Sequence, residues 1–302
     1  MMIAFGMRAL ATHRHAHAWL RPATMLLCTL AATVPLQAQH VRTLESARLL
    51  RDAAPIAVRV QFGTGTLNVA AADAPYLYHS ITRFGDAFMA PTSAWNASQR
   101  TLTLIGGQRS NARPAGEADD DDDENVQEWR LQLTRRAPLE LTIDAKAADA
   151  TLDLTGLPLR RFSLNTGAAA ATVRFDAPNT ESMSLFDAAV GAGGLKVIGL
   201  GHAGASEARI VGDVGDISLD LGGRWQRDMQ VSIRSAVGTI RITAPPTVGV
   251  EMASAGALAR VSATGTIMRD GNTWRSANFA AAAVKVRIVV TSMLGKVELV
   301  QR

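Results

Sequence analysis

The chain has 302 residues, of which 47% are hydrophobic and only 5% aromatic. Such a chain can bury a core of small aliphatic side chains, which suits closely spaced flat sheets and fits poorly with a bulky barrel or helical bundle. The formal net charge is +4, but most of this excess lies in the first 38 residues. The remainder is nearly neutral, which argues against nucleic-acid binding.

Residues 1–38 have the order of a secretory signal peptide. Basic and histidine residues come first, an apolar run follows at 25–34, and Ala38 is a small residue before a cleavage point ahead of Gln39. The run is shorter than a membrane span requires. An uncleaved N-terminal anchor is the alternative interpretation. The sequence therefore predicts export, with no transmembrane segment beyond this leader.

Cysteine usage agrees with export. Cys28 is the only cysteine and lies within the leader, so the exported chain has no disulfide. A lipoprotein anchor through Cys28 is less well supported, because Leu27 stands where Gly or Ala is expected. Export without disulfides suits a bacterial periplasm or cell surface.

Residues 39–107 are predicted to form N-terminal strands that cap a stack. Residues 42–52 show one short amphipathic period, which fits two helical turns or an extended lead-in. From Ile56 the apolar period becomes two, with a turn at Gly63–Gly65. Residues 75–107 carry most of the aromatics and are predicted to form three further strands. Terminal units of a stacked fold are atypical because an open end exposes apolar rows and unpaired backbone.

Residues 108–125 break the pattern and are predicted to form a flexible acidic loop. The run Asp119–Asp123 is followed by Glu124, and like charges at this density repel one another. The alternative is a site for calcium or another hard cation. Because the run lacks interspersed glycine and fixed spacing, any such binding should be weak.

Residues 126–302 are predicted to form a repetitive β-solenoid. Between Leu139 and Ile242 one unit recurs five times, roughly every 21–25 residues. Each unit holds an alternating apolar pair, an elbow of small residues and a second alternating pair. The first pairs are Leu141/Ile143, Phe162/Leu164, Met183/Leu185, Ala208/Ile210 and Val231/Ile233, and the second pairs are Leu152/Leu154, Val173/Phe175, Leu195/Val197, Ile217/Leu219 and Ile240/Ile242. The segment from Val284 to Leu299 copies the unit and is predicted to be the last coil.

The chain resembles a known group at these elbows. The stretches are 129–144 (WRLQLTRRAPLELTID) running into 147–159 (AADATLDLTGLPL), and 58–69 (VRVQFGTGTLNV). They are similar to the toast-rack and putative-adhesin families of exported bacterial cell-envelope proteins, over about residues 56–300. The sequence departs from the family pattern in the alanines at 147–148 and 168–170 and in the acidic insert. The resemblance implies a β-solenoid-like fold and an envelope setting, and it supplies no catalytic or binding residues.

Motifs for catalysis, cofactors and metals are absent from the sequence. His40, His79 and His202 are far apart, and without cysteine or His-x-x-His spacing a transition-metal site lacks ligands. There is no nucleophile elbow and no phosphate-binding loop. The glycines in 190–195 resemble half of a dinucleotide fingerprint, but no helix follows to bind a phosphate. No catalytic, cofactor-binding or metal residue is therefore predicted.

An enzyme remains the alternative, because a glycan-cleaving site needs only carboxylates and a basic partner in one groove. The candidate side chains are Asp144, Asp149, Asp153, Asp213, Asp216, Asp220, Arg160, Arg161 and Arg174. Trp225 and Trp274 follow turns and could stack on sugars, although core positions at strand ends are favoured. Aspartates at corners more often cap turns. Three or more carboxylates on one concave face would favour the enzyme.

The sequence thus predicts a non-catalytic, exported envelope or surface module. Binding or adhesion through the faces of the stack is the expected mode, with envelope glycans or envelope proteins as partners. The alternatives are a carbohydrate-active β-helix enzyme that uses surface aspartates, and a regulatory partner in envelope-stress sensing.

Overall fold

A computed structural model describes residues 41–72, 75–110, 127–256 and 258–302. Within these ranges the chain forms strands joined by turns, with one short 3-10 helix, so the all-β prediction is confirmed. The predicted signal peptide, His40 and the acidic run lie outside the described residues. No helix in the described ranges is long and apolar enough to cross a membrane.

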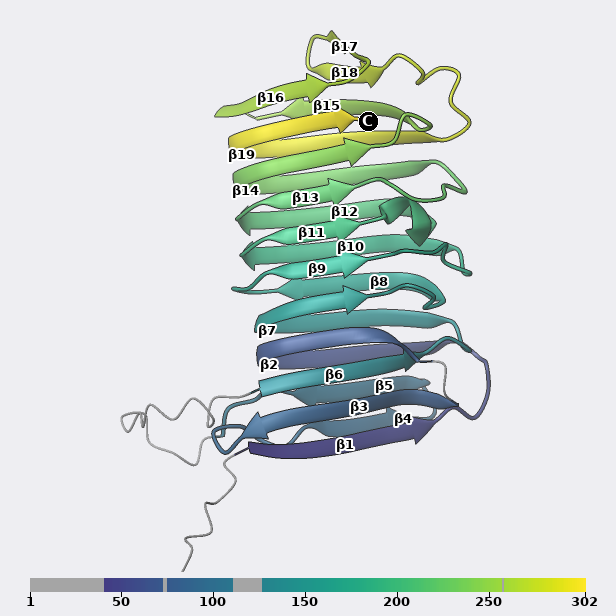
Figure 1. Cartoon of the computed structure of the whole chain (residues 1–302), viewed down its shortest axis with the longest axis vertical. Coiled ribbons are helices and arrows are strands. Elements are labelled where there is room, and N and C mark those ends of the chain that lie inside the picture. Colours follow the sequence, from purple (N-terminus) through teal and green to yellow (C-terminus); the bar gives the residue numbers. More distant parts are fainter. Residues whose placement is uncertain (1–40, 73–74, 111–126, 257) are drawn as a thin grey trace, which may run out of the picture. The chain divides into compact units, whose positions relative to one another are not determined.

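The strands follow one another along the chain as labelled in Figure 1. Their bounds are β1 Val41–Leu49, β2 Ile56–Ala72, β3 Tyr76–Gly85, β4 Thr92–Asn96, β5 Thr101–Gly106, β6 Gln127–Thr134, β7 Leu139–Asp153, β8 Leu159–Thr166, β9 Ala171–Arg174, β10 Met183–Ala192, β11 Leu195–Ile198, β12 Ala205–Val214, β13 Ile217–Asp220, β14 Met229–Ala244, β15 Gly249–Ala255, β16 Leu258–Thr264, β17 Ile267–Asp270, β18 Thr273–Ser276 and β19 Lys285–Gln301. The 3-10 helix η2, Leu200–Ala203, follows β11.

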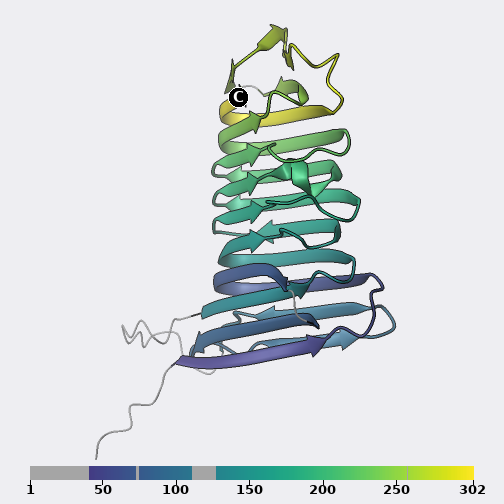
Figure 2. The same cartoon turned by 45° about the vertical axis from the view of Figure 1, so that its right-hand side comes forward.

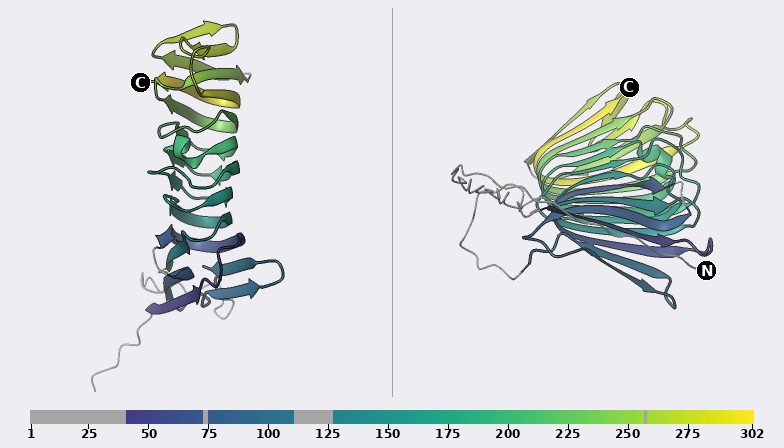
Figure 3. Two further views of the ribbon diagram at one scale, coloured as in Figure 1. Left: turned by 90° about the vertical axis from the view of Figure 1, so that its right-hand side faces the viewer. Right: turned by 60° about the horizontal axis from the view of Figure 1, so that its bottom comes forward.

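Each central coil gives one strand to each of two layers, which Figures 1 and 2 show stacked coil upon coil. The first layer holds β5, the first half of β2, the first half of β7, β8, β10, β12 and the first halves of β14 and β19. The second layer holds β6, the second halves of β2 and β7, then β9, β11, β13 and the second halves of β14 and β19. All of these neighbours are parallel, and Figure 3 shows the layers from two further sides.

The repeat in the sequence is the register of this stack. Leu141 lies beside Phe162, which lies beside Phe186 in the next coil. Like positions therefore fall over like, and alternate side chains point into the space between the layers. The size of the side chains along this inward row changes from coil to coil, because the small Ala208 lies beside the large Phe186. The rings of Phe162 and Phe186 have centroids 5.2 Å apart and are fully buried.

The elbows are narrow because glycines stack on one another there. Gly193, Gly215, Gly238 and Gly295 follow in successive coils, and the last three have φ of +140°, +145° and +140°. A Cβ on Gly238 would overlap the carbonyl group of Gly215, and one on Gly295 would overlap that of Gly238. Glycine is required here both for the positive φ and for the close approach of the next coil. We call these four residues the glycine column.

The prediction for the last segment is wrong. β19 does not close the stack but lies between β14 on one side and β15 and β16 on the other. It matches β14 residue for residue from Met229 opposite Val286 to Ala244 opposite Gln301. The physical reason is burial: β19 alternates apolar residues through both layers, whereas β16 is mostly exposed. The more apolar strand therefore takes the position that is covered on both sides.

The other end of the stack is built in the same way. β2 lies between β7 on one side and β5 and β6 on the other. The three strands predicted in 75–107 are β3, β4 and β5. β1 pairs antiparallel with β3, which makes residues 42–49 an extended lead-in and not helical turns. At each end the chain thus forms the outer strands first and then returns to a strand nearer the middle of the stack. β7 is this inner strand after β3–β6, and β19 is this inner strand after β15–β18.

Candidate functional site

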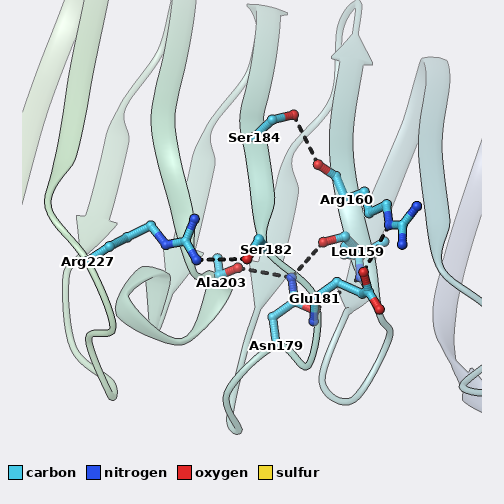
Figure 4. A network of polar contacts seen from close by, with 8 residues as sticks. All are labelled: Leu159, Arg160, Asn179, Glu181, Ser182, Ser184, Ala203 and Arg227. Atoms are coloured by element: carbon cyan, nitrogen blue, oxygen red, sulfur yellow. Dashed lines mark hydrogen bonds and ion pairs between the residues drawn. The ribbon is translucent and has the colours of Figure 1, made fainter.

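One buried asparagine joins three coils at the corner opposite the elbows. Asn179 accepts hydrogen bonds from the backbone N–H of Leu159 (3.1 Å) and donates to the carbonyls of Leu159 (2.7 Å) and Ala203 (3.1 Å). Figure 4 shows these bonds together with that of Arg160 to Glu181 (2.9 Å) on the same corner. Because every amide group of Asn179 is used inside the protein, this network serves the stack.

Most of the candidate aspartates also serve the stack. Asp149 accepts a hydrogen bond from the N–H of Ala170 (3.2 Å), and Asp216 accepts one from the N–H of Thr239 (2.8 Å). These bonds link one coil to the next. Asp153 accepts the N–H of Thr155 (3.1 Å) within its own turn. Asp153 therefore caps a turn, whereas Asp149 and Asp216 hold neighbouring coils together.

Asp220, Asp144 and Asp213 complete the set. Asp220 accepts the N–H groups of Gly199 (3.2 Å) and Gly222 (2.9 Å). Asp144 accepts a long hydrogen bond (3.4 Å) from the amide of Asn165, and Asp213 is exposed. In the part of the chain that the structure describes, no three carboxylate or histidine side chains are grouped so as to hold a metal ion.

The candidate arginines lie on exposed surfaces. Arg160 pairs with Glu181 (2.9 Å) and Arg174 with Asp176 (3.3 Å). Arg161 is exposed on the outer side of the first layer. Arg174 is the neighbour of Asp153 in the ladder of β7 and β9, but its ion pair is with Asp176.

The two histidines in the described ranges each have a local partner. His79 contacts Glu45 through Nε2 (2.7 Å) and Gln132 through Nδ1 (3.3 Å). The hydrogen bond to Glu45 raises the pKa of His79 above its ordinary value. The Nδ1 of His202 accepts the N–H of Arg224 (3.1 Å). The histidines do not meet each other.

The candidate tryptophans are structural. Trp274 is buried, with the guanidinium group of Arg269 lying 5.1 Å from the ring centroid. Trp225 is half-buried against the core, and its Nε1 donates to the carbonyl of Leu221 (2.9 Å). Both indoles thus pack on or in the core, Trp274 completely and Trp225 in part, which agrees with the favoured core interpretation.

A hollow on the outer side of the first layer differs from the corners described above, because several of its polar side chains make no hydrogen bond or ion pair within the described chain. We call it the first-layer groove, with a volume of about 520 Å³. Its polar rim consists of Gln61, Gln108, Asp144, Lys146 and Asn165, and its apolar parts are Ile105, Phe62 and Ala145. Among the described residues the side chains of Gln61, Gln108 and Lys146 have no hydrogen-bond or ion-pair partner. Of these side chains, only Asp144 is a candidate site residue on sequence grounds.

A second hollow of about 550 Å³ lies on the outer side of the second layer. We call it the second-layer groove, and its charged residues are Lys196, Asp220, Arg241 and Arg302. Here two of the side chains are already engaged: Asp220 caps its turn, and Arg241 donates to Glu298 (2.7 Å). Counted over the described lining residues, this groove has an excess of positive charge, whereas the first-layer groove has one carboxylate and one ammonium group.

Fold and grooves together define an all-β protein of stacked parallel coils whose regular residues are used for stacking. The family model for the N-terminal domain of toast_rack, DUF2154, matches residues 35–198, which is more than half of the chain. The chain therefore belongs to the toast-rack family, and the resemblance seen in the sequence is confirmed. No curated protein matches the chain.

Solved structures to which the chain shows similarity include three bacterial proteins. A putative cell adhesion protein from Clostridium sporogenes has 15% identity and a TM-score of 0.43, over 86% of this chain and 100% of that chain. A putative adhesin from Parabacteroides distasonis has 14% identity and a TM-score of 0.38, over 85% and 97%. A putative adhesin from Bacteroides fragilis has 9% identity and a TM-score of 0.35, over 87% and 98%.

Proposed function

We propose that the chain is a non-catalytic binding module of the cell envelope, a toast-rack β-solenoid that is exported and binds through the outer faces of its stack. The observation that carries the proposal is the first-layer groove. Polar side chains on a protein surface are ordinarily hydrated or paired, and a hollow lined by several unpaired ones is suited to hydrogen bonding with a ligand. Envelope glycans and envelope proteins are the partner classes that the setting offers.

The placement of the aspartates supports binding over hydrolysis. A glycosidase needs two carboxyl groups facing one another across the scissile bond, about 5–10 Å apart. Of the described residues that line the first-layer groove, Asp144 is the one carboxylate, and in the second-layer groove Asp220 already accepts hydrogen bonds from two backbone N–H groups. A general acid would have to come from elsewhere.

One sample tests the proposal against the enzyme alternative. The purified protein, without its leader, is mixed with envelope fractions and polysaccharides, and both retention and the release of reducing ends are measured. We expect retention of the protein without release of reducing ends. Release that is lost in Asp144→Asn or Asp220→Asn would establish an enzyme and overturn the proposal, as would the absence of retention on every fraction.

A further inference from the structure

We propose that the first-layer groove binds a neutral, linear, β-linked glycan that lies along the stack axis, with successive sugar units over successive coils. The inference rests on the proposed function and adds the ligand class, the site and the direction of the chain. It follows from the way three polar side chains of the groove are placed in the parallel ladder.

The three side chains form consecutive rungs. Gln61 on β2 lies opposite Asp144 on β7, and Asp144 lies opposite Asn165 on β8. Parallel strands are spaced about 4.8 Å apart, which is close to the length of one hexose unit in an extended glycan. A polymer with one set of hydroxyl groups per unit therefore meets one planar amide or carboxylate group per coil. We call Gln61, Asp144 and Asn165 the polar ladder.

The chemistry of the ladder suits sugar hydroxyls. A carboxylate accepts two hydrogen bonds in one plane, and an amide both donates and accepts, as neighbouring hydroxyl or N-acetyl groups do. The Asp144–Asn165 bond is long, at 3.4 Å, so both groups retain capacity for a ligand. Gln108 and Lys146 flank the ladder with further donors.

An apolar surface continues the ladder on one side. Ile105 on β5 lies opposite Gln61 on the outer side of the first layer and is partly exposed, whereas Phe62 and Ala145, which also border the groove, are buried in the core. The C–H faces of sugar rings pack on such surfaces, while the hydroxyl groups on their edges reach polar side chains. The groove thus offers both kinds of contact along a single line.

Charge selects a neutral glycan for this groove. Among the described residues, Asp144 and Lys146 are the charged side chains of this groove, so they give an acidic polymer no net attraction, and its carboxylates would face Asp144. The second-layer groove, with Lys196, Arg241 and Arg302 against Asp220, is the place where an acidic polymer would be attracted. We therefore expect neutral glycans to bind in the first-layer groove and acidic glycans to prefer the second-layer groove.

The test is calorimetric titration of the leaderless chain with β-1,4-linked oligomers of one to six units. Two neutral series, of N-acetylglucosamine and of glucose, and one acidic series, of mannuronate, are compared. We expect a neutral series to bind, with an affinity that rises from the monosaccharide to about the tetrasaccharide and then levels off, because the ladder has a finite length. The variant Q61A/D144A/N165A should lose about tenfold or more in affinity, since several ligand hydrogen bonds disappear together.

Matched variants and a second readout separate the outcomes. Lys196→Ala with Ser218→Ala, in the second-layer groove, should leave the affinity for the neutral oligomers unchanged. Any of four results would overturn the inference. The first two are equal affinity for monosaccharide and tetrasaccharide, and tighter binding of the acidic series. The other two are no binding of either neutral series, and unchanged binding by the ladder variant. If the ladder variant is still retained on envelope fractions in those cases, the proposed function stands and only its site and ligand fall. Loss of retention by the unaltered chain would instead remove the proposed function itself.

Discussion

The glycine column and the polar ladder lie in the same stack of coils, yet they use their residues in opposite ways. In the column, each glycine is fixed by the carbonyl group of the coil before it. In the ladder, Gln61 has no partner within the described chain, and Asp144 and Asn165 share one long bond. The contrast teaches how to find function in a repetitive fold: contacts that recur from coil to coil are explained by stacking, and side chains without such contacts need another explanation.

The largest expected effect is at the column. Gly238→Val should destabilise the chain by at least ~3 kcal/mol, because the new Cβ meets the carbonyl group of Gly215 and the residue must hold a positive φ. Urea unfolding of the two chains measures the difference. Gly271→Ala is the matched control, since Gly271 also has a positive φ (+58°) but no atom lies near its Cβ position. It should cost only about 1 kcal/mol, and equal losses in the two variants would contradict the role of stacking contacts.

The corner network should give the next effect. Asn179→Ala removes hydrogen bonds to Leu159 and Ala203 and leaves buried backbone groups unpaired, which should cost about 2–4 kcal/mol. The exposed Asn96, which bonds only to neighbouring side chains and backbone of its own turn, is the control and should lose less than about 1 kcal/mol on change to Ala. Thermal unfolding monitored by circular dichroism compares them. A loss at Asn179 no larger than that at Asn96 would show that the corner does not join the coils.

The polar ladder should show almost no effect on stability. The variant Q61A/D144A/N165A removes exposed or half-exposed side chains without buried partners, so its free energy of unfolding should stay within about 0.5 kcal/mol of the original. Chemical unfolding measures this on the same preparations that are used for ligand titration. Destabilisation of several kcal/mol would place the ladder with the stacking residues and remove the contrast.

The smallest effect concerns pH at the outer strand β1. The hydrogen bond that His79 donates to the Glu45 carboxylate raises the pKa of His79 above its ordinary value of 6.5. The contact therefore stabilises the pairing of β1 with β3 fully below about pH 6.5, and this contribution is lost as the pH rises through the raised pKa. Hydrogen exchange of β1 amides, corrected for the intrinsic pH dependence, should accelerate over that range. The same correction should leave Glu45→Gln with no such step, and a step of the same size in that variant would refute the pairing.

Much of the stack could be predicted from the sequence because its signal is periodic. The paired apolar positions from Leu141 to Ile242 fix which side chains point inward, and the elbow residues mark the bends. The order of the coils at the C-terminal end could not be read in this way. Both 248–264 and 284–299 alternate, and the choice between them depends on how much apolar surface each strand buries when all of the others are present.

The groove was harder to predict than the fold. Gln61, Asp144 and Asn165 are far apart in the sequence and of three residue types, so no motif joins them. One usable signal existed: they hold the same outward position in their coils, which the register of the repeat gives. Most of the candidate aspartates at the corners accept hydrogen bonds from backbone N–H groups of their own turn or of the next coil, because such groups lie within reach of a short carboxylate side chain.

Hydrogen exchange of the leaderless chain, with and without a neutral β-1,4-linked hexasaccharide, tests the central claim most directly, that function lies in the residues stacking leaves unused. The account predicts new protection in the first layer at residues 59–62, 142–146 and 163–167, where the ladder and its flanks lie, with no change at residues 196–198 and 218–220 of the second layer. Protection confined to the second layer, or no protection anywhere at saturating ligand, would contradict it.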